Sequence, residues 1–175
     1  MNKALFLDRD GVINNDLGYV HKQKDIIFLP GIFELVKKAK SLNYLVVIIT
    51  NQAGIGRGYY SVAQFNNLTD WMKNKFIEND GCIDAVYFCP YHPTEGIGNY
   101  KIDSFLRKPN PGMIHKASLD LDINLSNSIM VGDNLTDMQA AESAGINKLF
   151  LYGKKSSLYY SIDSLFELLD FLWLQ

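Results

Sequence analysis

The segment KALFLDRDGVIN, from Lys3 to Asn14, joins an apolar run to two carboxylates and a glycine. Residues 4–7 are continuously apolar, which is typical of a strand buried on both faces. Asp8 and Asp10 lie two residues apart, so their side chains point the same way from an extended chain. Gly11 allows a sharp turn beside a ligand. Two carboxylates at the carboxyl end of a buried parallel strand lie where open α/β sheets bind ligands.

Strand-like and helix-like segments alternate along the rest of the chain. Apolar runs predict strands at 44–49, 85–88, 128–131 and 147–152, and helical spacing or caps predict helices at 30–43, 61–76, 111–120, 135–144 and from about 163 to the end. Ser61 and Gln64 have the spacing of a capping box. This alternation predicts an α/β fold: a doubly wound parallel sheet of about five strands with helices on both faces.

The size and charge of the chain limit its organisation and its partners. Its 175 residues suffice for one domain with a substantial core, and we predict a single domain over residues 1–175. The net charge is −2 without a long basic or acidic block, so we expect neither a nucleic-acid nor a membrane partner. No apolar run suits a spanning helix, and the N-terminus lacks the pattern of a signal peptide. Two cysteines are too few for a disulfide framework, so we expect a cytoplasmic protein, and we further expect a monomer.

Polar groups suited to one task follow three of the predicted strands. They are Asp8 with Asp10, Thr50 with Asn51, and Asp133, and a basic pair, Arg107 and Lys108, precedes a predicted helix. A doubly wound sheet gathers the carboxyl ends of its strands along one edge. Carboxylates that hold Mg²⁺, a hydroxyl and an amide for phosphate oxygens, and a lysine that offsets negative charge together favour phosphoryl transfer.

The motifs DRDGVI, IITN, RKP and VGDNLTDM, in this order, resemble those of the haloacid dehalogenase (HAD) superfamily of aspartate-nucleophile phosphatases. Within it, the chain most resembles the D-glycero-D-manno-heptose-1,7-bisphosphate 7-phosphatases. The matching segments are DLGYVH (16–21), TNQAGIGRGYY (50–60), CPYHP (89–93) and RKPNPGM (107–113). Histidinol-phosphate phosphatases share the acid and lysine motifs but look less similar in GYVH and GIGRG, so they rank second.

The resemblance implies Mg²⁺-dependent hydrolysis of the 7-phosphate of a heptose 1,7-bisphosphate. This is a step toward ADP- or GDP-heptose for lipopolysaccharide or capsule, with a phosphosugar as the small-molecule partner. The alternatives are hydrolysis of histidinol phosphate or another small phosphate ester, and a catalytically silent regulator that binds a phosphosugar. Retention of the acid Asp10 speaks against the silent regulator, because a protein that only binds its ligand does not need that acid.

The resemblance also implies roles for individual residues. Asp8 is expected as the nucleophile and Asp10 as the general acid, with Thr50 and Lys108 stabilising the transferring phosphoryl group. The expected magnesium ligands are Asp8, Asp133 and the backbone carbonyl of Asp10. Substrate contacts are expected from nine residues: Arg9, Asp16, Gly18, Tyr19, Asn51, Gln52, Arg57, Arg107 and Asn134. Asp137 has two interpretations. It orients Lys108 or the metal's waters, or it is an acidic residue at a helix N-terminus, where the helix dipole favours it.

The chain departs from the family pattern in two respects. Many members hold the loop before Arg-Lys-Pro with zinc through a Cys-x-His and a Cys-x-Cys pair, but Tyr91, Ser104 and Leu106 replace three of those ligands here. We therefore expect no structural zinc, and instead apolar packing of the loop by Tyr91, Tyr100, Ile102, Phe105 and Leu106. The connections 12–29 and 89–110 are too short for the separate cap domain that many superfamily members carry, so we expect an open site.

Overall fold

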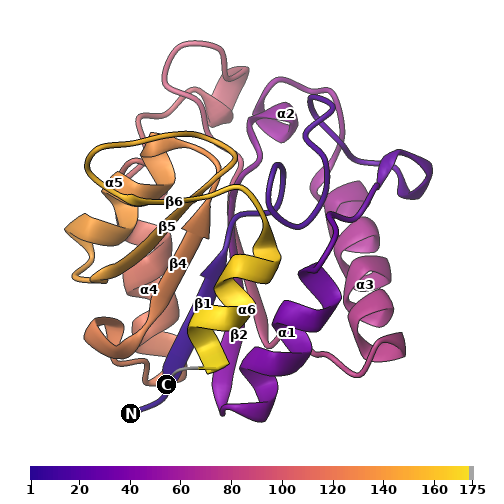
Figure 1. Ribbon diagram of the computed structural model, residues 1–175. Coiled ribbons are helices and arrows are strands. Elements are labelled where there is room, and N and C mark those ends of the chain that lie inside the picture. The colour runs from indigo at the N-terminus through magenta and orange to yellow at the C-terminus, as the bar shows by residue number, and fades with distance from the viewer. Residues whose placement is uncertain (174–175) are drawn as a thin grey trace.

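The computed structural model describes residues 1–173 and contains, within them, one six-stranded parallel sheet (Figure 1). Its spatial order is β3-β2-β1-β4-β5-β6, so the first strand lies in the interior of the sheet. The strands are β1 (Lys3–Leu7), β2 (Tyr44–Asn51), β3 (Ala85–Cys89), β4 (Ile129–Gly132), β5 (Lys148–Tyr152) and β6 (Tyr160–Ile162). Every strand pair is parallel, which requires a crossover between successive strands.

Helices cover both faces of the sheet, as the sequence predicts. They are α1 (Ile32–Ser41), α2 (Ala53–Gly56), α3 (Val62–Glu78), α4 (Gly112–Leu121), α5 (Leu135–Ser143) and α6 (Leu165–Trp173). On one face, α1, α3 and α6 pack on Leu5 and Leu7, and on the other α4 and α5 pack on Ala4 and Phe6. The alternation of these four buried residues explains why β1 is apolar throughout.

Within residues 1–173, the predicted helix and strand positions hold to within a few residues, and the capping box of Ser61 and Gln64 is present at the start of α3. Residues 174–175, the end of the last predicted helix, lie outside the described residues. The sheet has six strands in place of about five, because β6 pairs with β5 at one edge. The sequence does not predict β6, because this strand is three residues long and follows a polar stretch without strand periodicity. Nor does it predict α2, a single short turn inside the glycine-rich segment.

All strands point the same way, so their carboxyl ends share the upper edge of the sheet in Figure 1. The connections after β1, β2, β3 and β4 meet above this edge, while the N-terminus and the last turn of α6 lie toward the opposite edge. The fold therefore brings the polar residues that follow β1, β2 and β4 to one place.

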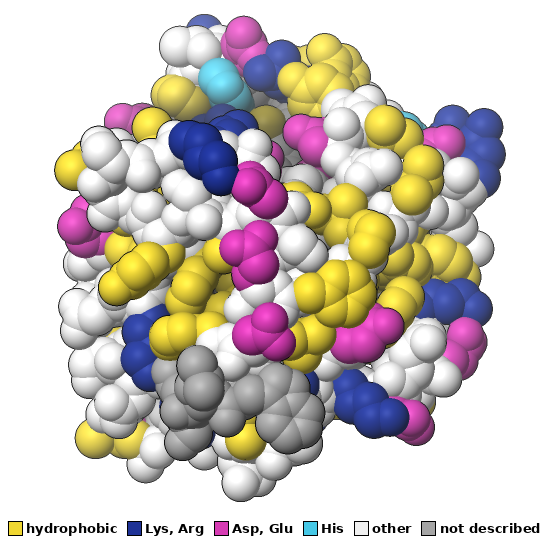
Figure 2. All heavy atoms as spheres, in the orientation of Figure 1, with side chains coloured by type: hydrophobic (Ala, Val, Ile, Leu, Met, Phe, Trp, Pro, Cys, Tyr) yellow, Lys and Arg dark blue, Asp and Glu magenta, His cyan; other side chains and the backbone are white. Residues whose placement is uncertain are grey.

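The α6 face of the molecule carries Lys and Arg side chains dispersed among acidic and hydrophobic ones, without one large basic patch (Figure 2). Over residues 1–173, no helix combines the length and the apolar character that a membrane crossing requires.

Candidate active site

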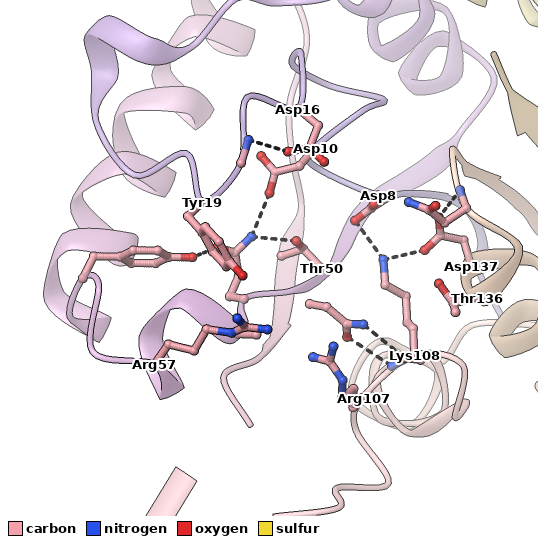
Figure 3. Close-up of a pocket in the computed structure, with 16 residues that line it drawn as sticks. Asp8, Asp10, Asp16, Tyr19, Thr50, Arg57, Arg107, Lys108, Thr136 and Asp137 are labelled. Atoms are coloured by element: carbon pink, nitrogen blue, oxygen red, sulfur yellow. Dashed lines mark hydrogen bonds and ion pairs between the residues drawn. The ribbon is translucent and has the colours of Figure 1, made fainter. Parts of the chain in front are cut away.

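A pocket of about 390 Å³ opens at the carboxyl edge of the sheet (Figure 3). Its lining combines carboxylates, cationic side chains and amides, which come from the connections after β1, β2 and β4 and from the loop before α4. The lining residues are Asp8, Asp10, Asp16, Gly18, Tyr19, Thr50, Asn51, Gln52, Ala53, Arg57, Tyr60, Arg107, Lys108, Asn134, Thr136 and Asp137. The fold thus gathers all but two of the residues that the sequence analysis singled out, the exceptions being Arg9 and Asp133.

Lys108 lies buried between two carboxylates at the floor of this pocket. Its Nζ is 2.8 Å from Asp8 Oδ1 and 2.6 Å from Asp137 Oδ1, and it donates to the carbonyl oxygen of Ile49 at 3.0 Å. These three acceptors match the three N–H groups of an ammonium. Asp137 therefore orients Lys108, which is one of the two roles that the sequence left open for it. Asp137 also caps α5, because its Oδ2 accepts from the backbone N–H of Asn134.

Burial and neighbouring charges together raise the pKa values of three groups at this site. Desolvation raises the pKa of Asp8 to about 8, although the nearby ammonium of Lys108 lowers it. Burial disfavours the charged form of Lys108, but the carboxylates of Asp137 and Asp8 outweigh that effect and raise its pKa above the ordinary value. Burial, reinforced by the charge of Asp137, likewise raises the pKa of Asp133. The site thus holds a surplus of acidic groups around one permanently charged lysine.

The carboxylates of Asp8, Asp133 and Asp137 form a group that fits a divalent metal ion. One oxygen from each lies within 4.8 Å of the others, and hard cations such as Mg²⁺ prefer oxygen ligands. Gly11 makes this approach possible, because its φ is +92° and a Cβ there would lie 2.5 Å from Cγ of Asp133. The Asp10 carboxylate is not part of this group, so its predicted contribution rests on its backbone carbonyl.

The raised pKa of Asp8 predicts how stability depends on pH when a chelator is present. Because Asp8 has a pKa of about 8 in the folded chain and 3.8 ordinarily, the folded chain binds its proton more tightly, and ionising Asp8 destabilises the fold as the pH rises across this interval. We expect metal-free Asp8→Asn to melt several degrees above the metal-free native chain at pH 8. A chain of this size gains about 2–4 °C per kcal/mol.

The measurement is calorimetry with excess chelator at pH 5 and pH 8. At pH 5 the difference in melting temperature shrinks, because Asp8 is then protonated and resembles asparagine. Asp80→Asn is the matched control, since Asp80 is exposed and pairs only with Lys37 on the surface. Two results would contradict this electrostatic account. One is a lower melting temperature for Asp8→Asn than for the native chain at pH 8, and the other is a difference in melting temperature that is the same at pH 5 and pH 8.

The Asp10 carboxylate is surrounded by donors. Arg9 donates to both of its oxygens, with the shortest contact at 2.7 Å from Nη2 to Oδ2. Asn14 Nδ2 donates to Oδ1 at 3.0 Å, and Gln52 Nε2 to Oδ2 at 3.1 Å. Arg9 itself is only 2% exposed and also donates to the carbonyl oxygen of Val20. Arg9 therefore holds Asp10 from the protein interior and does not line the pocket. The direct substrate contact expected for Arg9 does not fit this buried position.

Comparisons with known proteins place this geometry in a family. Residues 105–157 match the family model described as HAD-hydrolase-like. The D-glycero-alpha-D-manno-heptose-1,7-bisphosphate 7-phosphatase of Burkholderia mallei is 56% identical over 150 residues, covering 86% of this chain and 79% of that protein. The corresponding beta-named phosphatase of Vibrio cholerae is 48% identical over 148 residues, covering 85% and 80%.

The chain belongs to the heptose-1,7-bisphosphate 7-phosphatase family. A solved D,D-heptose 1,7-bisphosphate phosphatase from B. bronchiseptica, complexed with magnesium and phosphate, superimposes with a TM-score of 0.85 at 29% identity, covering 98% of each chain. The relatives include both alpha- and beta-named enzymes, so family membership leaves the anomer of the sugar open.

Two residues that this heptose phosphatase family pattern suggests as substrate contacts are engaged with the protein. Asn51 bonds the backbone of Lys108 twice, since Nδ2 donates to its carbonyl and Oδ1 accepts from its N–H, both at 3.1 Å. Asn51 therefore fixes the lysine's loop to β2. Asn134 donates to Asp133 Oδ1 at 2.9 Å and accepts from Lys154 at 2.7 Å. Both residues still line the pocket, and their contacts with substrate stay predictions.

The rim of the pocket carries aromatic and cationic side chains from the segments 16–21 and 50–60. Asp16 Oδ1 accepts from the N–H of Gly18 at 2.9 Å, which shapes the turn that presents Tyr19. The guanidinium of Arg57 stacks over the Tyr19 ring at 5.4 Å and pairs with Glu95 of the long loop. Arg107 donates to the carbonyl oxygen of Tyr91 at 3.2 Å. The rim thus carries two guanidinium groups above an acidic floor.

The loop that many heptose phosphatases hold with zinc is anchored here in part by apolar packing. Tyr91 and Leu106 pack on the cluster around buried Cys89, and the Tyr91 and Tyr100 rings lie 5.9 Å apart. Ile102 and Phe105 are 44% and 60% exposed, so they bury less surface than Tyr91 and Leu106, although the Phe105 ring lies 6.2 Å from that of His115. The expectation of no zinc stays a prediction.

Three lining residues were not singled out by the sequence analysis: Ala53, Tyr60 and Thr136. Ala53 and Tyr60 lie inside the quoted segment TNQAGIGRGYY, and Thr136 lies inside VGDNLTDM. The motifs therefore predicted the segments in which these residues lie. The residue type alone does not distinguish a tyrosine that lines a pocket from a tyrosine in the core.

Proposed function

We propose that this chain is a Mg²⁺-dependent phosphatase that removes the 7-phosphate of D-glycero-D-manno-heptose 1,7-bisphosphate. The observation that carries the proposal is the position of the Asp8 carboxylate. It lies at the floor of the pocket, held by Lys108 and grouped with Asp133 and Asp137. A nucleophilic carboxylate beside a cation site and below a basic rim suits a dianionic phosphate ester. The names of the relatives supply the sugar.

In the first half of the reaction, an Asp8 oxygen attacks phosphorus and the bond from phosphorus to the sugar oxygen breaks. Asp10 gives its proton to the leaving oxygen, which releases the heptose as an alcohol. In the second half, Asp10 takes a proton from water as that water attacks the phosphorus of the aspartyl phosphate, which frees inorganic phosphate and regenerates Asp8. Lys108 stays charged throughout and offsets the negative charge that gathers near Asp8.

The carboxylates of Asp8 and Asp133, together with the backbone carbonyl of Asp10, would hold Mg²⁺. When bound, the ion reduces the repulsion between the attacking carboxylate and the phosphate dianion and helps to neutralise the transferring group. Thr50 lines the same pocket, and its hydroxyl would donate to a phosphoryl oxygen.

The basic rim gives the second phosphate of the substrate a place to bind. Arg107 lines the pocket next to Lys108, and Arg57 lines it next to Tyr19 (Figure 3). Arg57 already pairs with Glu95, whereas the guanidinium of Arg107 contacts only a carbonyl oxygen in its described side-chain bonds. Arg107 is therefore the stronger candidate for the distal phosphate. The cytoplasmic location, the single domain and the monomeric state stay predictions.

The test is steady-state phosphate release with Mg²⁺ from both anomers of heptose 1,7-bisphosphate and from histidinol phosphate. We expect kcat/KM for one heptose anomer to exceed that for histidinol phosphate at least about 100-fold, because a missing pair of charge-assisted contacts to the second phosphate costs roughly 3 kcal/mol. A preference for histidinol phosphate would keep the mechanism and change the substrate. Absence of turnover on all three and on a wider panel of phosphate esters would favour the silent phosphosugar-binding regulator.

A further inference from the structure

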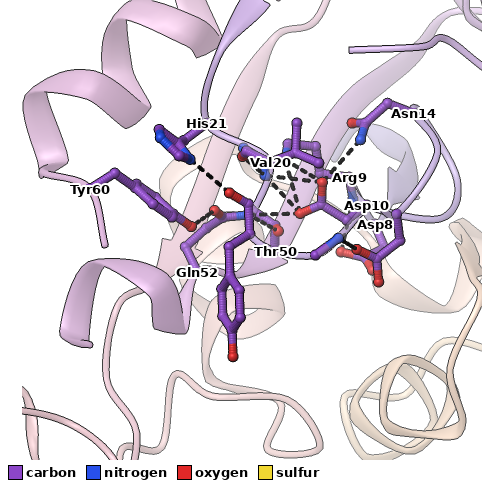
Figure 4. A network of polar contacts seen from close by, with 12 residues as sticks. Asp8, Arg9, Asp10, Asn14, Val20, His21, Thr50, Gln52 and Tyr60 are labelled. Carbon is purple, nitrogen blue, oxygen red and sulfur yellow. Dashed lines mark hydrogen bonds and ion pairs between the residues drawn. The ribbon is translucent and has the colours of Figure 1, made fainter. Parts of the chain in front are cut away.

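A chain of buried hydrogen bonds links Tyr60 through Gln52 to two residues of the proposed reaction (Figure 4). The Tyr60 hydroxyl donates to Gln52 Oε1 at 2.5 Å. Gln52 Nε2 then donates to Asp10 Oδ2 at 3.1 Å and to Thr50 Oγ1 at 2.8 Å. Gln52 is 1% exposed and Tyr60 is 5% exposed, so water does not compete readily for these bonds.

The amide of Gln52 has no donor left for a substrate. A primary amide nitrogen carries two N–H groups, and Asp10 and Thr50 accept from both. The amide oxygen faces Tyr60. Although Gln52 lines the pocket, these bonds point to a role in holding its neighbours, which differs from the direct substrate contact expected for it.

The orientation of the amide determines what Asp10 and Thr50 present to the pocket. Gln52 Nε2 donates to Asp10 Oδ2 and its Oε1 accepts from Tyr60, so the amide nitrogen faces Asp10 and the amide oxygen faces Tyr60. Because Thr50 Oγ1 accepts from Gln52, the hydroxyl proton of Thr50 points elsewhere and is free for a phosphoryl oxygen. Burial raises the pKa of Tyr60 to about 12, so its hydroxyl remains a donor at the pH of the reaction.

Packing fixes the Tyr60 ring in this position. Gly54 lies against the ring, where a Cβ would stand 2.3 Å from Cε1. The imidazole of His21 stacks on the ring, parallel to within 6° at a centroid distance of 4.9 Å. His21 is in turn held at the carbonyl oxygen of Tyr19, at 2.8 Å from Nδ1. The segments 16–21 and 50–60 therefore meet around this one ring.

We propose that Tyr60 and Gln52 are positioning residues that hold Asp10 and Thr50 in the orientations required for phosphoryl transfer. The inference rests on the proposed phosphatase function. Tyr60 acts only through Gln52, because its hydroxyl reaches neither of the two reacting side chains in the described bonds. Removing the hydroxyl leaves Gln52 Oε1 buried without a donor, which frees the amide to rotate and releases both partners.

Kinetics of Tyr60→Phe, Gln52→Met and the double variant test the proposal, with Tyr87→Phe as the matched control. Tyr87→Phe makes the same chemical change at a hydroxyl that bonds Asp120 on the surface. We expect Tyr60→Phe to lower kcat about tenfold and Gln52→Met roughly 30-fold or more, with KM within about twofold of the native value. The double variant is no slower than Gln52→Met alone, since Tyr60 acts through Gln52. Tyr87→Phe keeps the native kcat.

Three kinetic results would overturn the proposal: a raised KM with unchanged kcat, native kcat in Tyr60→Phe, or multiplicative losses in the double variant. A second measurement does not depend on activity. In the native chain, the two Gln52 side-chain amide protons exchange slowly with water by NMR, and this protection is lost in Tyr60→Phe but kept in Tyr87→Phe. A native chain that is inactive on every phosphate ester would refute the proposed function, whereas unchanged Gln52 protection in Tyr60→Phe would refute the hydrogen-bond chain itself.

Discussion

Asp8→Asn lowers kcat for the heptose bisphosphate by about 10⁴-fold or more, because an amide cannot replace a carboxylate as nucleophile. Asparagine has the same shape and keeps an oxygen for Lys108, so the pocket and the fold persist. The loss is therefore chemical, and it coincides with the higher metal-free melting temperature expected for the same variant. Both effects have one cause, the buried charge of Asp8, as expected where an active site trades stability for activity.

The measurement is phosphate release at saturating substrate and Mg²⁺, with substrate binding followed separately by calorimetry. Asp80→Asn serves again as the control, because it changes the same functional group on the surface and leaves turnover native. If Asp8→Asn retained kcat within tenfold of the native value, Asp8 would not be the nucleophile.

Lys108→Met has the second large expected effect, and it acts on both activity and stability. The substitution leaves Asp8 and Asp137 buried without their shared cation. Breaking a buried ion pair by removing one partner costs about 3–5 kcal/mol, and loss of a preorganised charge at a reacting centre lowers kcat by roughly 10²–10³-fold. We expect both losses, measured by chemical denaturation in chelator and by steady-state turnover.

The response of Lys108→Met to Mg²⁺ separates the electrostatic cause from simple loss of packing. Without the ammonium, the acidic group of Asp8, Asp133 and Asp137 has more uncompensated charge, so added Mg²⁺ raises the melting temperature of the variant more than that of the native chain. Lys116→Met is the control, since Lys116 forms an exposed pair with Asp120. A variant with native stability and turnover would contradict the assigned role of Lys108.

The main elements of this fold could be predicted from the sequence because each carries a local signal. Buried parallel strands appear as short apolar runs, and the capping residue Ser61 and the helix-ending glycine Gly145 mark helix boundaries directly. The edge strand β6 has no such signal. Three residues cannot display a period, and the pairing of Tyr160–Ile162 with β5 depends on where the preceding turn places it.

The site was predictable as a set of positions but not as a set of contacts. Asp8, Thr50 and Lys108 follow from strand ends and motifs, and they line one pocket. The ion-pair partners of Arg9 and Arg57 could not be predicted from strand ends and motifs. Both are arginines near a phosphate pocket, yet Arg9 turns back onto Asp10 and Arg57 pairs with Glu95, 38 positions further along the sequence. Such choices depend on tertiary contacts that residue type does not encode.

Phosphorus NMR of the native chain turning over heptose 1,7-bisphosphate with Mg²⁺ tests the central claim most directly. We predict that the signal of the 7-phosphate is replaced by that of inorganic phosphate while the anomeric phosphate signal persists. With Asp8→Asn, we expect the spectrum of the substrate to stay unchanged. Loss of the anomeric phosphate first, or an unchanged spectrum with the native chain, would contradict the proposed function.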